Sequence, residues 1–413
     1  MRPLQKSSII SSIYNHGFLY PTPSSLSYFW NFGSLTGLAL GIQIVTGIAL
    51  TFWYIGNVDL AFSSVEFLMR EVNGGWLIRY LHSNGASLFF VVVYLHIGRS
   101  LYFGSYTYPR EKLWISGVII FLAMIITAFL GYVLPWGQMS YWAATVITSL
   151  LSVVPLIGEQ LLFFVWGGIS IDQPTLTRVY GLHYLLPFVL VALVVLHIIL
   201  LHENGSNNGS GMEKLDTVPF HPYYTYKDLL GYIITLIGYC FITFQYPNLL
   251  SHSDNYILAD PGVTPTHIVP EWYFLPFYAI LRSVPSKAGG VFLLAGAILT
   301  LLLIPFFVIP IQRSGFFRPF FQNGLIAFIF VWFVLGWSGG NPIETPYYEI
   351  CQAATFLYFF FFLVFLPVIN YAENYVYFES YNAERCLSRM LSKFTDLSLR
   401  IKHHRKTLIH NKN

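Results

Sequence analysis

Eight apolar segments, each about 20 residues long, constrain the fold of this chain more than any other feature of its sequence. A helix of about 20 apolar residues is long enough to cross the hydrocarbon core of a bilayer. The segments are residues 31–53, 77–103, 113–134, 179–201, 229–247, 289–309, 321–338 and 349–369. They predict an all-α polytopic membrane protein with eight transmembrane helices.

The composition excludes the main soluble classes of protein. Charged residues make up 10% of the 413 residues, against about 25% in an ordinary soluble domain. Hydrophobic residues make up 55%, so the chain has too little polar surface to cover itself in water. We therefore exclude a soluble globular enzyme, a disordered chain and a nucleic-acid binder, and expect the lipid bilayer as its surroundings.

The placement of lysine and arginine predicts the orientation of the spans. Eight spans put both termini on one side of the membrane, and that side collects 17 of the 22 basic residues. Eight of the 17 lie in a basic tail, residues 381–413, but the bias persists without the tail. Because basic residues favour the inner side, we expect both termini to lie inside.

Three further features of the sequence limit the options. The cysteines Cys240, Cys351 and Cys386 are far apart and no Cys-x-x-Cys-His motif occurs, so no covalent c-type haem is indicated. The N-terminus shows no cleavable targeting segment, and we expect none. Residues 140–153 and 158–166 form amphipathic stretches too short to cross a bilayer, which we expect to lie along its surface.

Four histidines in the second and fourth spans share one spacing. His82 and His96 are 14 residues apart, and so are His183 and His197. Fourteen helical residues rise about 21 Å and return to within about 40° of the same face. The two spans run in the same direction, so His82 shares a depth with His183, and His96 with His197. Facing imidazoles can ligate one haem iron from both sides, which predicts two non-covalent b-type haems at two depths.

Two other interpretations of these histidines stay open at this point. They could be buried residues satisfied by hydrogen bonds, or a proton relay in a polytopic carrier or channel. The identical spacing on two parallel helices favours the haems. A reduced-minus-oxidised spectrum separates the redox protein from the carrier.

Glycines and arginines near the histidines support the haem interpretation. Gly33 and Gly47 in the first span are 14 residues apart, as are Gly117 and Gly131 in the third. Glycine leaves room for a flat macrocycle, although glycine can also mark helix–helix contacts in membranes. Arg79 and Arg99 lie one helical turn from His82 and His96, where they could neutralise haem propionates or anchor the helix at the interface.

Six motifs resemble those of a known family. They are WNFG (30–33), GWLIRYLHSNG (75–85), GYVLPWGQ (131–138), HENGSNN (202–208), PFHPYY (219–224) and PEWY (270–273). Together they are similar to the cytochrome b family of the respiratory quinol–cytochrome c reductase, complex III. The resemblance runs from about residue 28 to 370, and eight spans in one chain are typical of its mitochondrial and bacterial members.

The resemblance implies a function, partners and a location. Ubiquinol would be oxidised near the outer face, and quinone would be reduced near the inner face with electrons passed through the two haems. The implied partners are a Rieske iron–sulfur protein, a c-type cytochrome, other complex III subunits and a second copy of the complex. The implied location is the mitochondrial inner membrane, with both termini in the matrix.

The resemblance also implies residues for the outer quinone site. Quinol oxidation releases protons, and Glu271 would accept them, with Tyr132 and Tyr273 shaping the pocket beside Pro270. From the sequence alone, an ordinary helix start is the favoured interpretation of Pro270 and Glu271. Ala143 stands where the family usually has glycine, and we expect its methyl group to narrow this pocket.

At the inner face, the resemblance assigns proton donation to His202 and Asp228, with Ser206, Asn31 and Lys227 as further candidates. Interfacial capping by His202 and Asp228 is the alternative. The family usually has proline after residue 208, but Gly-Ser-Gly follows here and loosens the loop.

The chain divides into three predicted parts. Residues 1–210 would form an N-terminal four-helix bundle that holds the haems. Residues 211–380 would supply four further helices and the quinol site. Residues 381–413 form the basic extension, either solvated near lipid headgroups or in contact with another subunit; its apolar positions are Leu387, Leu391, Phe394 and Leu397.

Overall fold

The structure is a computed structural model that describes residues 8–211, 216–382, 384, 385 and 388. Within these residues, eight helices are long and apolar enough to cross a membrane, which confirms the predicted all-α, eight-span fold. They are the spans Tyr28–Leu50 (η2 and α2), Gly75–Tyr102 (α4), Glu111–Val133 (α5), Gln173–Asn204 (α8), Phe220–Gln245 (α9), Lys287–Phe307 (α11), Pro319–Gly339 (α12) and Tyr347–Asn382, which begins with α13 (Tyr347–Phe360). Cys386 and the four apolar positions of the basic tail lie outside the described residues.

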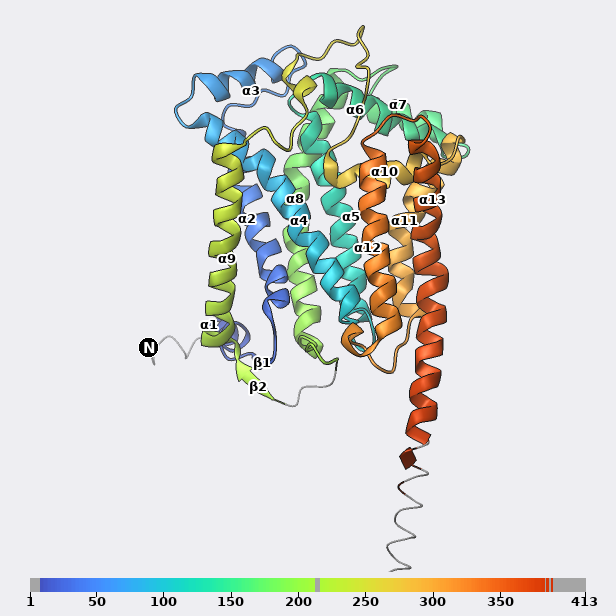
Figure 1. The fold of residues 1–413 in the computed structure, drawn as a ribbon. Helices are drawn as coiled ribbons and strands as arrows, with labels where there is room; N and C mark the ends of the chain where they lie inside the picture. The colour runs from blue at the N-terminus through green and yellow to red at the C-terminus, as the bar shows by residue number, and fades with distance from the viewer. Residues whose placement is uncertain (1–7, 212–215, 383, 386–387, 389–413) are drawn as a thin grey trace, which may run out of the picture.

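The helices form two groups that lie side by side (Figure 1). In one group α2 packs against α4, and α5 packs against α8. In the other, α11, α12 and α13 pack around the short helix α10 (Leu275–Arg282). Helix α9 packs mainly against α2 and α4, so it lies with the first group although it follows residue 210. The division at residue 210 stays a prediction.

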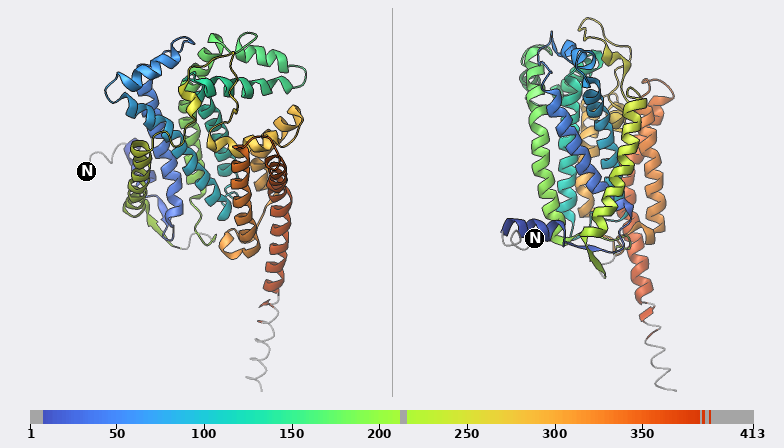
Figure 2. Two further views of the ribbon diagram at one scale, coloured as in Figure 1. Left: turned by 45° about the horizontal axis from the view of Figure 1, so that its top comes forward. Right: turned by 90° about the vertical axis from the view of Figure 1, so that its left-hand side faces the viewer.

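The two ends of the bundle carry different short elements (Figure 1). Helices α3 (Ala61–Arg70), α6 (Gln138–Ser149) and α7 (Gly158–Trp166) cover the end that we call upper, and α6 and α7 coincide with the predicted amphipathic stretches. The lower end carries α1 (Ser8–Gly17) and a two-stranded antiparallel sheet, in which β1 (Pro21–Pro23) pairs with β2 (Thr217–Pro219). Figure 2 shows α1 roughly perpendicular to the long helices, at one side of the lower end of the bundle. The sequence patterns did not predict α1, α3 or α10.

Local sequence explains where the longest regular helix begins. The carboxylate of Asp172 accepts a hydrogen bond from the backbone N–H of Gln173 at 2.8 Å, and Thr175 Oγ1 accepts one from the backbone N–H of Asp172 at 3.3 Å. This reciprocal cap satisfies N–H groups that a helix start otherwise leaves unpaired. It fixes the start of α8, which carries His183 and His197.

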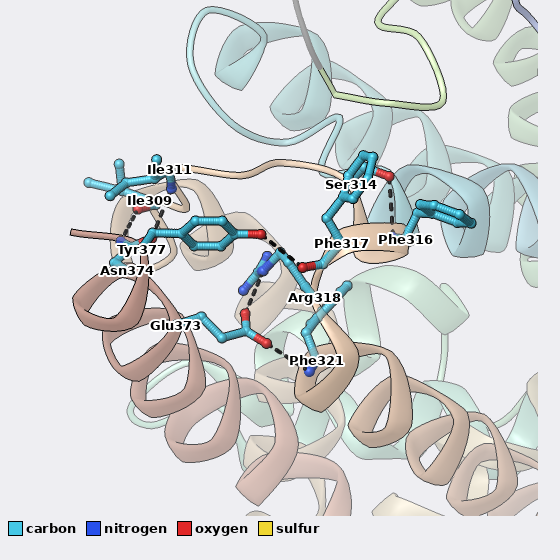
Figure 3. Close-up of polar contacts among 10 residues, drawn as sticks. All are labelled: Ile309, Ile311, Ser314, Phe316, Phe317, Arg318, Phe321, Glu373, Asn374 and Tyr377. Carbon is cyan, nitrogen blue, oxygen red and sulfur yellow. Dashed lines mark hydrogen bonds and ion pairs between the residues drawn. The ribbon is translucent and has the colours of Figure 1, made fainter. Parts of the chain in front are cut away.

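A buried ion pair ties the last span to the start of α12 (Figure 3). Arg318 Nε donates to Glu373 Oε2 at 2.6 Å, and Glu373 Oε1 accepts from the backbone N–H of Phe321 at 3.2 Å. The two charged side chains are 1% and 9% exposed. The described part of the last helix runs to Asn382, past the end that hydropathy predicts at residue 369, and Arg318 neutralises the Glu373 charge on this added stretch.

Candidate functional site

The four predicted histidines lie in two facing pairs between α4 and α8. The ring centres of His82 and His183 are 6.3 Å apart near the upper end, and those of His96 and His197 are 6.4 Å apart near the lower end. The structure therefore brings together the residues that the shared spacing paired.

Hydrogen bonds hold three of the four rings by the same nitrogen. The Nδ1 atom of His82 lies 3.0 Å from Thr46 Oγ1, and that of His183 lies 2.9 Å from the carbonyl oxygen of Thr127. The Nδ1 atom of His197 lies 2.8 Å from Ser116 Oγ. Thr46 and Ser116 give their own protons to the carbonyl oxygens of the preceding turn, so in each case Nδ1–H is the donor. The lone pair of Nε2 then remains available to a metal.

His96 is held differently. Its Nδ1 lies 3.1 Å from a terminal nitrogen of Arg99, which can only donate. Arg99 Nε is buried and has no hydrogen-bond partner among the described residues. The guanidinium thus carries unsatisfied charge in an apolar interior, and an anionic group beside this pair would neutralise it and release His96 Nδ1.

Each of the four predicted glycines lies against one of the four histidines. A Cβ added at Gly47 would meet Cε1 of His82 at 3.0 Å, and one at Gly131 would overlap the ring of His183. At Gly33 and Gly117 the added Cβ would lie 3.4 and 3.3 Å from Cε1 of His96 and His197. Each glycine therefore leaves room for the imidazole ring that packs against it.

A cavity of about 260 Å³ surrounds the upper pair and extends to a carboxyl group. Arg79, Tyr132, Glu271 and Tyr273 line it together with His82 and His183. Glu271 follows the loop at the upper end and hydrogen-bonds Tyr132. Tyr273 stacks on Phe90 with ring centres 4.0 Å apart.

The electrostatic environment of Glu271 suits proton exchange. Burial raises its pKa to about 7, against the smaller opposing effects of the Arg79 guanidinium and the Tyr132 hydrogen bond. Burial also raises the pKa of Tyr273, which keeps that phenol protonated near neutral pH. A carboxyl group that titrates near pH 7 can both accept and release a proton.

Two residues predicted for this pocket do not line the cavity. Pro270 lies just before the 3-10 helix η5 (Trp272–Phe274), outside the cavity wall that the described residues form. Ala143 is 6% exposed within α6 and is absent from that wall as well. Any narrowing by its methyl group is therefore indirect, through the packing of α6.

A second cavity, of about 600 Å³, surrounds the lower pair. Its walls include Asn31, His202, Ser206 and Asp228 from four segments of the chain. Lys227 does not line the cavity, because its ammonium group donates to the backbone oxygen of Leu26 at 2.5 Å. Asn31 is buried, and its amide nitrogen donates to the backbone oxygen of Lys227 at 2.9 Å.

The structure adds residues that sequence reasoning missed. Thr46 and Ser116 orient the rings of His82 and His197, and Gln43 donates to the backbone oxygen of His82 at 3.0 Å. Thr46, Ser116 and Gln43 each precede a predicted glycine by one to four residues. This closeness is the only sequence feature that could have indicated them. His16 on α1 also lines the lower cavity.

Comparison with known proteins decides the family. Residues 18–205 match the family described as cytochrome b/b6/petB, and residues 258–359 match the family described as cytochrome b (C-terminal)/b6/petD. The chain belongs to the cytochrome b family. A cytochrome b of Rickettsia bellii is 55% identical over 368 residues, which cover 88% of this chain and 92% of that protein.

Other cytochrome b proteins are nearly as similar. The cytochrome b of Arabidopsis thaliana is 53% identical over 368 residues, covering 89% of this chain and 93% of that protein. The cytochrome b of Dictyostelium citrinum is 52% identical over 377 residues, which cover 91% of this chain and 97% of that protein. A solved hyperthermophilic respiratory complex III contains a chain that superimposes with a TM-score of 0.84 at 33% identity, covering 90% of this chain and 99% of that one.

The described residues fit a haem between each pair. Two metal–nitrogen bonds of about 2.0 Å and two ring radii of about 1.1 Å separate the centres of two opposed imidazole ligands by about 6.2 Å. The observed separations are 6.3 and 6.4 Å. The orphaned Arg99 Nε fits an anionic group, and the cavities around both pairs leave room for one.

Proposed function

We propose that this chain is the haem- and quinone-binding core subunit of respiratory complex III, which oxidises ubiquinol and passes electrons towards a c-type cytochrome. The two facing imidazole pairs at two depths carry this proposal. His82 and His183 would hold the outer haem, and His96 and His197 the inner haem. Each b-type haem, when bound, exchanges single electrons.

The proposal includes partners and a location. A Rieske iron–sulfur protein would take one electron of each ubiquinol, and a c-type cytochrome would receive it. Further complex III subunits and a second copy of the complex complete the assembly. The membrane is the mitochondrial inner membrane, with both termini on the matrix side, where the chain carries most of its basic residues.

At the outer site, Glu271 would accept protons from ubiquinol. Oxidation of one ubiquinol releases two electrons and two protons. The Glu271 carboxylate takes a proton from a quinol hydroxyl, with Tyr132 hydrogen-bonded to the same carboxyl group. Tyr273 stacks on Phe90 and borders the cavity, so it shapes the space in which the quinol ring lies.

At the inner site, His202 and Asp228 would give protons to the quinone. Reduction of one quinone takes two electrons and two protons, one for each carbonyl oxygen. His202 comes from the end of α8 and Asp228 from α9, so they border the same cavity from two helices. Ser206 and Asn31 line the cavity beside them and would orient the ring by hydrogen bonds.

The pH dependence of ubiquinol oxidation tests this function. Below pH 7 Glu271 is protonated and cannot accept a proton, so the rate of the assembled complex should rise as pH increases through about 7. Glu271→Gln should lower that rate roughly a hundredfold and remove the rise. The assay is ubiquinol-dependent reduction of cytochrome c.

The exposed residue Glu159 on α7 provides a matched control. Glu159→Gln should keep both the rate and the pH profile of the wild type. A wild-type complex with no ubiquinol-dependent activity would contradict the proposed function. A Glu271→Gln complex with the full rate and the wild-type profile would contradict the role of Glu271.

A substitution of Gly47 tests the fit of the outer haem. Gly47→Val should displace the ring of His82, since even a Cβ there meets Cε1 at 3.0 Å, and the purified complex should lose one of its two b-type haems. Gly41 lies on the same helix with nothing within 4 Å of an added Cβ, so Gly41→Val should keep both. The measurement is a reduced-minus-oxidised spectrum, and equal spectra for the two variants would refute the fit.

A further inference from the structure

We propose that His16 takes up protons from the aqueous phase on the lower side and passes them to His202 during quinone reduction. This inference deepens the proposed function and rests on it, because it concerns the supply of protons to the inner quinone site. His16 lies on α1, an element that none of the family motifs includes. Its role follows from where that helix lies.

Three aromatic rings meet at the end of α8. The ring of His16 is nearly parallel to that of His202, with an angle of 15° between planes and 5.6 Å between centres. The ring of Tyr20 is also within 15° of parallel to His202, at 4.3 Å. No direct hydrogen bond joins the two imidazoles among the described residues, and a ring-centre separation of 5.6 Å is short enough for one bridging water to join their nitrogens.

The three residues differ in their access to water. His16 is exposed, whereas His202 and Tyr20 are only partly exposed. All three line the cavity of about 600 Å³ that also reaches Asp228 and the lower imidazole pair. The cavity therefore has a titratable group at its aqueous side and its proposed proton donors farther in.

The groups around His16 suit the passage of a proton. Histidine exchanges protons near neutral pH more readily than any other side chain. The titratable and charged groups that face this end of the cavity, from α8, the start of α5, α9 and the segment before β1, are His202, Arg110, Asp228 and Tyr20. Asp228 is the only acid among them, so a proton has few alternative carriers between water and His202.

The proton balance requires a supply of this kind. When His202 gives a proton to a quinone carbonyl oxygen, its imidazole is left neutral and must regain a proton before the next turnover. The His16 imidazolium gives that proton to His202, and His16 regains one from water. Each quinol formed consumes two protons and two electrons, and His16 supplies the proton that leaves through His202.

The experiment compares variants that separate stacking from proton transfer. His16→Phe keeps an aromatic ring on His202 but carries no proton, and His16→Ala removes both. In the assembled complex with the outer site inhibited, we measure the rate at which added ubiquinone reoxidises the prereduced b-type haems, from pH 6 to 8. We expect both variants to be slower by about tenfold at pH 8 and close to wild type at pH 6, where water protonates His202 directly.

Chemical rescue and a control complete the test. Added imidazole should restore the His16→Ala rate at pH 8, and His221→Phe, which alters an exposed histidine on α9, should behave like the wild type. A wild-type rate in His16→Phe at every pH, or no rescue by imidazole, would overturn the inference. If the wild-type complex itself shows no reoxidation by ubiquinone, the proposed function fails instead.

Discussion

The His82→Ala and His96→Ala variants should each lose one b-type haem, and the haem that is lost should differ between the two variants. Loss of a hydrogen-bond partner of a metal ligand already lowers affinity or activity roughly 10–100-fold, so loss of the ligand should lower ubiquinol–cytochrome c reductase activity by more than about a hundredfold. His82 belongs to the upper pair and His96 to the lower one. Potentiometric titration of the purified complexes should then show one missing component per variant.

The exposed histidine His221 gives the control for these variants. His221→Ala should retain both components and full activity, because its ring contacts Phe18 and Thr225 and lies away from both pairs. Two results would contradict the assignment of the pairs. One is a variant of His82 or His96 that retains both components, and the other is the loss of the same component from both variants.

Glu373→Gln should destabilise the protein by about 3–5 kcal/mol, because it leaves the buried Arg318 guanidinium without its counter-charge. The pair is almost fully buried, and both terminal nitrogens of Arg318 already lack hydrogen-bond partners among the described residues. Its loss should loosen the last span from the start of α12 (Figure 3). The measurement is unfolding of the purified chain in mixed micelles by titration with sodium dodecyl sulfate.

An exposed ion pair serves as the comparison. Arg70 and Glu66 lie one helical turn apart on α3, and a terminal nitrogen of Arg70 is 2.5 Å from Glu66 Oε2. The Arg70 side chain is 74% exposed, so Glu66→Gln should lower the free energy of unfolding by less than about 1 kcal/mol. Replacing both members of the buried pair, as in Arg318→Met with Glu373→Leu, should recover much of the stability that Glu373→Gln loses. Equal effects of Glu373→Gln and Glu66→Gln would show that the buried pair does not hold the last span.

The sequence predicted the spans from the length of their apolar segments, and it predicted the histidine pairs from helical periodicity. Fourteen residues bring His82 and His96 to one face of any regular helix, and parallel helices then match the depths of His82 and His183. The glycines follow the same period, and each lies against a histidine. These features need no knowledge of how the chain folds between the spans.

Contacts between segments that are far apart in the sequence leave no periodic pattern from which to predict them. Arg318 and Glu373 are 55 residues apart in the sequence. From the sequence alone, an acidic residue such as Glu373 indicates the end of the last transmembrane span. The ring of His16 reaches His202 only because α1 lies beside the lower end of the bundle (Figure 2). Ala143 and Pro270 entered the outer site by resemblance alone, and their side chains lie outside its cavity.

The haem content of the wild-type complex tests the central proposal most directly. Acid–acetone extraction of the purified chain in its complex should release two haems per chain, because no covalent attachment motif occurs in the sequence. Besides the signal of the c-type cytochrome, electron paramagnetic resonance of the oxidised complex should show two low-spin, six-coordinate irons, as two imidazole ligands on each require. A single haem per chain, or a high-spin iron with one protein ligand, would contradict the two facing histidine pairs as the redox core.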